Sequence, residues 1–255
     1  MKPRGNGMKY PNIIQPSDFG PIIVSKNDTI ISRTITQNGY WAGDDIQLIG
    51  KILEYRLTTK ERVVFYDIGS NIGTHTLALG SLFRNRIMIR AFEAQRQIYY
   101  MLCGTVALNN LTNTFCHHNA VSNVSDEPLD IMLPDYSANN NFGALELRPP
   151  KHSDNQNMVY RERETVKTIT VDHFKEAIDF IKLDIEGMED AALRGATQSI
   201  DQHRPACLIE MHKTDAAFVL EFFKSRNYSA WMKSENLIAL PSEMNVTLNG
   251  INRLY

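Results

Sequence analysis

The chain has 255 residues, of which 43% are apolar and 22% are charged, as in an ordinary globular protein. A net charge of −2 and a pI near 6.4 exclude a general electrostatic attraction to nucleic acids or anionic membranes. The same composition excludes a collagen-like chain, a coiled-coil rod and a globally disordered chain. A chain of this length can bury a sizeable core without disulfides or a structural metal.

The cysteines and the N-terminus indicate a cytoplasmic protein. Cys103, Cys116 and Cys207 are odd in number and have no zinc-ligand spacing. We therefore expect reduced thiols, with two or three of these cysteines in the core. No apolar stretch follows the basic N-terminal segment, so the sequence predicts no secretory signal. No apolar run approaches the ~20 residues that cross a bilayer.

Residues 1–43 contain four prolines and several glycines, and we interpret them as an arm or lid that leads into the main domain. One short strand is expected around residues 29–35. The main domain is predicted to span residues 44–255. It begins with a helix over residues 44–55, where acidic residues stand at the start and isoleucines and leucines share one stripe.

From Arg62 onward, segments typical of strands and of helices alternate. Strands are predicted at residues 63–66, 86–92, 113–121, 180–183 and 206–211, and helices at 72–83, 95–109, 188–200 and 214–226. Two further strands are expected after Tyr228, around a turn near Pro241. This alternation is typical of an α/β fold, a doubly wound sheet with a largely parallel core and helices on both faces.

Residues 122–165 interrupt the alternation with a polar segment rich in asparagine and proline. A structureless loop of that length is uncommon in a compact domain unless it has a function or is disordered. We interpret it as an irregular insertion with short strands at residues 129–133 and 159–170. It is expected to lie over the mouth of the sheet.

The segment VVFYDIGSNIGTHT, residues 63–76, predicts a ligand site. A buried strand ends at Asp67, a glycine-rich turn follows, and a helix begins near Ile72, as at nucleotide sites on the carboxyl edge of a parallel sheet. Gly69 and Gly73 permit a tight turn and close approach of the backbone to a ligand. Their spacing differs from the dinucleotide fingerprint GxGxxG, which argues against a nicotinamide-dependent oxidoreductase.

Two acids define the chemistry of that ligand. Glu93 stands twenty residues after Gly73, at the end of the next predicted strand, where an acid typically accepts hydrogen bonds from ribose hydroxyls. Asp67 would repel a pyrophosphate but suits a cationic ligand, or a neutral ligand rich in hydrogen-bond donors. Together Asp67 and Glu93 predict an adenosine ligand without phosphates. S-adenosylmethionine, which carries an ammonium and a sulfonium group, has this chemistry.

Polar residues follow two further predicted strands. Asp184 and Glu186 come directly after one strand, and alternation places Glu210 and His212 on the same side at the end of another. Because carboxyl ends of parallel strands meet at one edge, these side chains should approach the glycine-rich turn. We predict Asp184, Glu210 and His212 as catalytic candidates, with His212 favoured as general base by its ordinary pKa. Lys182, between apolar neighbours, is expected to be paired or to reach the site.

These motifs resemble the FkbM family of S-adenosylmethionine-dependent methyltransferases. The resemblance covers residues 60–227 and is carried by YDIGSNIGTHTL (66–77), FEA (92–94), VALNNL (106–111), NAVSN (119–123), TVDHF (170–174), IKLDIEGMEDAALRGA (181–196) and IEMH (209–212). The turn DIGxNxG becomes a specific signature when KxDIEGxE follows at this distance. Ala94 and Ser70 depart from the residues that are commoner in the family.

The resemblance implies a class I methyltransferase fold, with a seven-stranded sheet that contains one antiparallel strand. It also implies S-adenosyl-L-methionine as cofactor and methyl transfer to oxygen, frequently a hydroxyl of a sugar in a glycolipid, polysaccharide or natural product. By position, it implies these cofactor-binding residues: Asp67, Gly69, Asn71 and Gly73 for the methionine part, Glu93 for the ribose, and Asp184 near the transferred methyl group.

The residues favour a small-molecule or glycan acceptor over a nucleic acid. Amino-methylating enzymes of nucleic acids commonly carry an (Asp/Asn/Ser)-Pro-Pro-aromatic motif, whereas Pro149 and Pro150 are followed by Lys151, and no basic stripe is present. We therefore expect no nucleic-acid partner. His117 and His118 lack further ligands at a useful spacing, so no metal site is expected. A non-catalytic protein that binds S-adenosylmethionine with the same fold stays an open alternative.

Overall fold

The computed structural model describes residues 10–147 and 158–255. The first nine residues of the predicted arm lie outside the described residues, as do Pro149 and Pro150 of the predicted insertion. Within the described ranges, no helix combines the length and the apolar character that crossing a bilayer requires.

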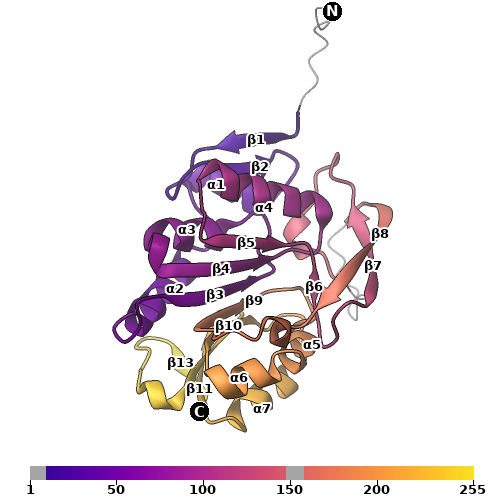
Figure 1. Cartoon of the computed structure of the whole chain (residues 1–255). Helices are drawn as coiled ribbons and strands as arrows, with labels where there is room; N and C mark the ends of the chain where they lie inside the picture. The colour runs from indigo at the N-terminus through magenta and orange to yellow at the C-terminus, as the bar shows by residue number, and fades with distance from the viewer. Residues whose placement is uncertain (1–9, 148–157) are drawn as a thin grey trace, which may run out of the picture.

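An eight-stranded sheet forms the centre of the fold, in the order β13-β11-β12-β10-β9-β3-β4-β5 (Figure 1). Its strands are β3 (Val63–Ile68), β4 (Ile87–Phe92), β5 (Thr114–His117), β9 (Phe180–Leu183), β10 (Ala206–Glu210), β11 (Tyr228–Lys233), β12 (Asn236–Pro241) and β13 (Asn252–Arg253). The five strands from β5 to β10 are parallel, and β12 runs antiparallel to both of its neighbours. The expected seven-stranded sheet with one reversed strand is therefore present, and β13 extends its edge.

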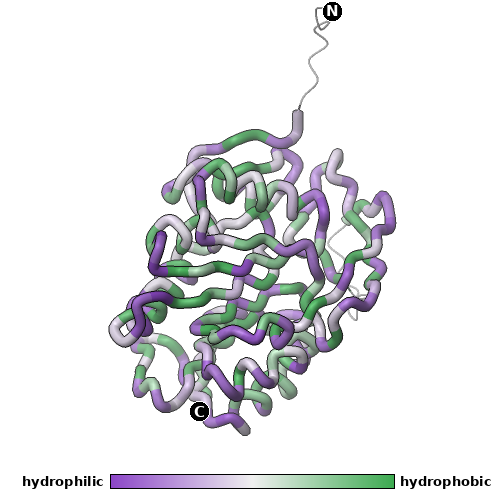
Figure 2. Tube along the Cα trace, viewed as in Figure 1, coloured by the Kyte–Doolittle hydropathy of each residue, from purple (hydrophilic) through white to green (hydrophobic). Residues whose placement is uncertain are grey.

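Both faces of the sheet are covered, because alternate residues of each central strand point to opposite sides. In β3, Val63 and Phe65 join one apolar cluster, whereas Tyr66 and Ile68 join the other. Helices α2 (Gly43–Arg56), α3 (Thr74–Phe83) and α4 (Arg96–Leu108) pack on the first side, and α5 (Glu189–Arg194), α6 (Thr197–His203) and α7 (Ala216–Lys224) on the second. Figure 2 shows apolar residues recurring along the central strands of this buried layer.

The described part of the predicted arm packs onto the main domain. Strands β1 (Asn12–Gln15) and β2 (Ile22–Ser25) form an antiparallel hairpin, and helix α1 (Ile31–Asn38) follows. The expected strand at residues 29–35 is wrong. Asp28 explains the helix, because its carboxylate accepts hydrogen bonds from the backbone N–H of Ser32 at 2.7 Å and of Ile30 at 3.3 Å and thereby satisfies the start of α1.

The predicted insertion contains the two strands that the sequence indicates. Strands β7 (Pro128–Pro134) and β8 (Tyr160–Ile169) pair antiparallel, and β6 (Ala120–Val121) pairs with β8. The strand expected over residues 113–121 is divided, since β5 stays in the main sheet and β6 leaves it. In Figure 1 the hairpin of β7 and β8 projects from one end of the main sheet.

Three further expectations need correction. The helix expected over residues 188–200 is divided into α5 and α6 at Gly195, where an added Cβ would lie 2.1 Å from the carbonyl oxygen of Ser122. The C-terminal turn lies between β11 and β12, before Pro241. Only one cysteine, Cys207, is buried, and all three are free thiols.

Short 3₁₀ turns complete the described elements: η1 (Arg84–Arg86), η2 (Phe142–Ala144), η3 (Val171–Phe174) and η4 (Ser242–Met244).

Candidate active site

The turn between β3 and α3 is built around Gly69. Its φ is +78°, and an added Cβ would lie 1.8 Å from the carbonyl oxygen of Asp184, so a side chain has no room here. The backbone N–H groups of Gly69 and Ser70 both donate to the carbonyl oxygen of Phe92, at 3.0 and 2.9 Å. The turn is therefore held against the carboxyl ends of both neighbouring strands, β9 and β4.

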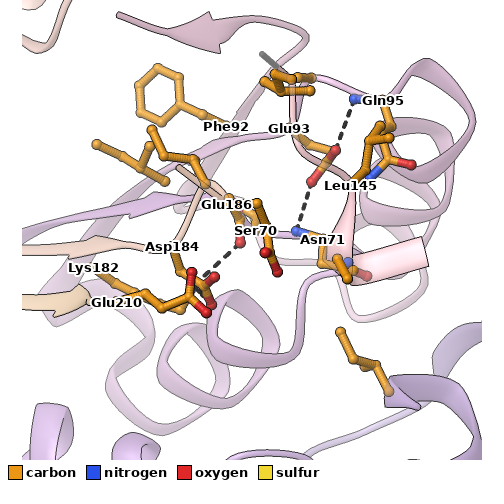
Figure 3. A pocket seen from close by; sticks show the side chains of 18 of the residues that line it. Ser70, Asn71, Phe92, Glu93, Gln95, Leu145, Lys182, Asp184, Glu186 and Glu210 are labelled. Carbon is orange, nitrogen blue, oxygen red and sulfur yellow. Dashed lines mark hydrogen bonds and ion pairs between the residues drawn. The ribbon is translucent and has the colours of Figure 1, made fainter. Parts of the chain in front are cut away.

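Glu93 follows β4 and faces this turn. Its carboxylate accepts hydrogen bonds from the backbone N–H of Asn71 at 3.0 Å and of Gln95 at 2.8 Å (Figure 3). The side chain is buried, and burial raises the pKa of Glu93 to about 7, although the two N–H donors oppose that shift. The carboxylate is thus fixed in orientation by the backbone before any ligand arrives.

Asp67 lies beneath the turn and is fully buried. Thr76, in the first turns of α3, donates its hydroxyl to one carboxylate oxygen of Asp67 at 2.6 Å. The other oxygen has no hydrogen-bond partner among the described residues and lies 3.8 Å from the Lys182 Nζ atom. Burial raises the pKa of Asp67, and the charge of Lys182 opposes that rise. Asp67 therefore stabilises the start of α3 through its hydrogen bond with Thr76.

Lys182 joins the turn to the end of β9. Its buried Nζ atom lies 3.1 Å from a carboxylate oxygen of Asp184 and donates to the carbonyl oxygen of Gly69 at 3.3 Å. Burial disfavours the charged ammonium, but the charges of Asp184 and Asp67 outweigh this and raise the pKa of Lys182. Lys182 is thus paired, one of the two roles expected from the sequence.

Three carboxylates gather next to Lys182. Oxygens of Asp184, Glu186 and Glu210 lie within 4.8 Å of one another. Lys182 balances Asp184, and Lys213 balances Glu186 at 2.6 Å. Carboxylates at such a spacing can hold a divalent cation, but with these two ammonium groups the cluster does not require a metal to balance its charge.

Glu210 differs from the other two acids of the cluster. Its Oε2 atom is buried and has no hydrogen-bond partner among the described residues. Burial, and then the charges of Asp184 and Glu186, raise the pKa of Glu210 to about 9. At neutral pH the side chain therefore holds a proton unless a cationic ligand stabilises its ionised form.

A cavity of about 190 Å³ opens between the turn and the acids. In Figure 3, Glu93 stands on one side of it and Asp184, Glu186 and Glu210 on another. Apolar walls come from the strand ends, the arm and the insertion, through Phe92, Ala120, Val121, Ile31, Trp41, Leu145 and Leu147. The cavity thus has apolar walls and an acidic floor, the latter formed by Asp184, Glu186 and Glu210.

A family model described as Methyltransferase FkbM domain matches residues 67–230, a range that includes the glycine-rich turn, Glu93 and the three clustered carboxylates. The chain belongs to the FkbM methyltransferase family. Its fold is the class I methyltransferase fold, with an α/β sheet that is mostly parallel. Its cofactor is S-adenosylmethionine.

The chain is similar to solved structures at low sequence identity and with TM-scores below 0.5. The methyltransferase FkbM from Methylobacillus flagellatus KT is 14% identical with a TM-score of 0.49; the match covers 82% of this chain and 60% of that one, so the chain spans less than two thirds of that protein. Precorrin 8W decarboxylase from Methanobacterium thermoautotrophicum is 12% identical with a TM-score of 0.47, covering 89% and 99%. An rRNA methylase from Streptococcus thermophilus is 12% identical with a TM-score of 0.43, covering 82% and 96%. No curated protein matches the chain in sequence.

Most of the site residues predicted from the sequence line the cavity between the turn and the acids. The lining includes Gly69, Asn71, Glu93, Asp184 and Glu210. Asp67 and Gly73 are not among the lining residues and instead shape the turn from within. His212 lies outside the cavity, because it follows the end of β10 by two residues; its side chain is 55% exposed, and its Nδ1 atom lies 3.7 Å from Glu235.

Several lining residues of the FkbM cavity were not predicted. Trp41 and Leu145 come from the arm and the insertion, which have no periodic pattern that would place them. His75 stands only two residues after Gly73, inside the motif, so its position in the sequence could have pointed to it. Lys213, which is not a lining residue, was also not predicted; it donates to the carbonyl oxygen of Ala144 at 3.4 Å and to Glu186, and so links the insertion to the acids.

Proposed function

We propose that this protein transfers a methyl group from S-adenosylmethionine to a hydroxyl group of a sugar, a glycolipid or a natural product. One observation carries the proposal. A single cavity holds both a carboxylate oriented by backbone N–H groups, Glu93, and an acid, Glu210, whose Oε2 atom has no hydrogen-bond partner among the described residues.

The residues that line the cavity fit the cofactor. Glu93 would accept hydrogen bonds from the two ribose hydroxyls, as an acid after the second strand does in nucleotide-binding sheets. The backbone at Gly69 and Asn71 would lie against the methionine part, and Asp184 would lie near the positive charge of the sulfonium. The apolar residues Ala120 and Val121 offer a wall for the adenine. When bound, the cofactor supplies an electrophilic methyl group.

An acceptor hydroxyl reacts faster when a positioned base removes its proton, typically by ~10²–10⁴-fold. Among the three predicted catalytic residues, we assign this role to Glu210, whose Oε2 atom has no partner in the described chain and which becomes a base when the nearby sulfonium charge favours its ionised form. Asp184 is held by Lys182 and would orient the reacting groups. His212 is solvent-exposed and outside the cavity, so we do not assign it the proton transfer.

The reaction also requires that the acceptor hydroxyl be aligned with the methyl group of the cofactor and that water be excluded from the site. Ile31 and Trp41 from the arm and Leu145 and Leu147 from the insertion line the same cavity. These apolar groups would exclude water from the hydroxyl and its base. The arm and the insertion are therefore proposed to shape the acceptor site, while the sheet edge holds the cofactor.

The acidic floor of the cavity favours a neutral acceptor. Lys182 and Lys213 balance Asp184 and Glu186, so the cluster gains an excess negative charge when the positive sulfonium of the cofactor favours the ionised form of Glu210. A phosphate next to the reacting atom would be repelled. This supports a sugar or small-molecule hydroxyl rather than a nucleic acid as the acceptor. We also propose that the protein acts in the cytoplasm, because its three cysteines are free thiols.

The experiment is a transfer assay with methyl-labelled S-adenosylmethionine. The acceptors are neutral oligosaccharides, lipid-linked sugars and hydroxylated small molecules, with tRNA and rRNA as the competing class. The proposal expects label in a methyl ether, and a loss of ~10²-fold or more in turnover for Glu210→Gln. Glu235→Gln, at an exposed site outside the cavity, is the control and should retain activity.

Two results would contradict the proposal. Label on RNA alone would move the protein to the nucleic-acid class. Binding of S-adenosylhomocysteine without transfer to any acceptor of the panel would support the alternative, a non-catalytic binding protein with this fold.

A further inference from the structure

His75 is a buried polar residue, and one of its two ring nitrogens, Nε2, has no hydrogen-bond partner among the described residues. It lies in the first turn of α3, is 6% exposed and lines the cavity. Its Nδ1 atom lies 3.5 Å from the hydroxyl of Thr74, whereas its Nε2 atom has no hydrogen-bond partner among the described residues. Because an unpaired buried donor is costly, a bound ligand is the natural source of the missing partner.

The surroundings of His75 favour a negatively charged ligand group. The first backbone N–H groups of a helix have no acceptor within the helix, and their partial positive charge attracts anions. Thr74 and His75 bring this end of the ten-residue helix α3 to the cavity. The buried ammonium of Lys182, which is paired with Asp184, lies close enough for its positive charge to act on His75.

The imidazole is neutral in this setting. Burial, and then the charge of Lys182, hold the pKa of His75 well below its usual range. A neutral imidazole has one N–H donor and one acceptor nitrogen, and the hydroxyl of Thr74 can donate to Nδ1. That arrangement leaves the proton on Nε2, so the unused atom is a donor.

We infer that the Nε2 atom of His75 donates a hydrogen bond to the carboxylate of the amino-acid part of S-adenosylmethionine, at the N-terminus of α3. This inference rests on the proposed function, because it requires the cofactor in the cavity. The cofactor has no phosphate, so that carboxylate is its only anionic group. Asn71, which binds Glu93 on the ribose side, is only four residues from His75, so one turn of chain can serve both parts of the cofactor.

The test compares two ligands that differ in the amino-acid part. S-adenosylhomocysteine carries the carboxylate, and 5′-methylthioadenosine lacks the whole amino-acid group. We expect His75→Leu to weaken S-adenosylhomocysteine binding about tenfold or more in calorimetry and to change methylthioadenosine binding less than about twofold. His75→Gln, whose amide can donate from a similar place, should recover most of the loss.

His203→Leu is the matched control, since His203 ends α6 on the other side of the sheet. A second readout uses the unaltered protein with ¹⁵N-labelled histidine. We expect S-adenosylhomocysteine to shift the Nε2 resonance of His75 and methylthioadenosine to leave it nearly unchanged.

Each contrary outcome is distinguishable. Equal losses for both ligands would assign His75 a purely structural role and overturn the inference. Unchanged binding of S-adenosylhomocysteine by His75→Leu, or an Nε2 resonance that does not respond, would do the same. If the unaltered protein bound neither ligand, the proposed function would fail first, and the inference would fall with it.

Discussion

Replacing Gly69 by alanine should lower the free energy of unfolding for two reasons, which a comparison with Gly250→Ala separates. The first is conformational, because φ is +78° at Gly69. The second is steric, because the new Cβ would lie 1.8 Å from the Asp184 carbonyl oxygen. Gly250 provides the matched control: its φ is +77°, and an added Cβ there would meet nothing within 4 Å. Gly250→Ala therefore carries the first cost alone.

The expected magnitudes follow from these two geometries. A left-handed conformation costs an alanine about 1–2 kcal/mol, and this applies to both variants. Relieving the clash at Gly69 requires the Cβ and a backbone oxygen to separate by more than an ångström, and a misfit of this kind costs about 1–3 kcal/mol further. Gly69→Ala should thus lose about 2–5 kcal/mol of unfolding free energy, against about 1–2 kcal/mol for Gly250→Ala.

Thermal unfolding measures both losses. For a chain of this size each kcal/mol lowers Tm by roughly 2–4 °C, so Gly69→Ala should unfold several degrees below Gly250→Ala. S-adenosylhomocysteine binding should be lost in Gly69→Ala and kept in Gly250→Ala. Unfolding of the two variants at the same temperature, or binding of S-adenosylhomocysteine by Gly69→Ala as tight as that of the unaltered protein, would contradict these expectations.

Three further predictions concern the acids and their partners. The pKa of Glu210 is raised from 4.5 to about 9 in the folded protein, so its contribution to stability falls as pH rises between these values; Glu210→Gln should flatten Tm against pH over this range and raise Tm at pH 8. His212→Ala should change turnover less than about twofold, because this side chain is exposed and outside the cavity, and a large loss would restore it as a base. Lys213 contacts Glu186 at 2.6 Å and the insertion at Ala144; Lys213→Met should raise KM for the acceptor several-fold with S-adenosylhomocysteine affinity retained, and equal losses in both would contradict a role at the acceptor side.

The sequence predicted the sheet and its ligand edge because both depend on local patterns. A strand that ends in an acid, a turn that needs glycine, and a second acid at the next strand end are all readable from spacing. Parallel pairing then brings these ends together: Asp67 pairs with Lys182 between β3 and β9, and Ile68 pairs with Phe92 between β3 and β4. Gly69, Glu93 and Asp184 therefore lie close together, and local patterns together with the rule for parallel strands are enough to predict this.

What the sequence did not predict depends on contacts between distant segments. Helix α1 replaces an expected strand because the Asp28 side chain satisfies its first N–H groups, a contact that β-branched composition does not reveal. His212 lies past the end of β10, where strand alternation no longer sets its direction. The arm and the insertion line the cavity through Trp41 and Leu145, although neither segment has a helical or strand period at that point.

The central claim is that this cavity holds S-adenosylmethionine with Glu93 on the ribose. Calorimetry with S-adenosylhomocysteine tests it most directly, with NAD as the control ligand and Glu93→Gln as the variant. We expect micromolar binding of S-adenosylhomocysteine, no binding of NAD, and a loss of about tenfold or more in S-adenosylhomocysteine affinity for Glu93→Gln. A folded protein that binds NAD instead, binds neither ligand, or binds S-adenosylhomocysteine equally well in Glu93→Gln would contradict it.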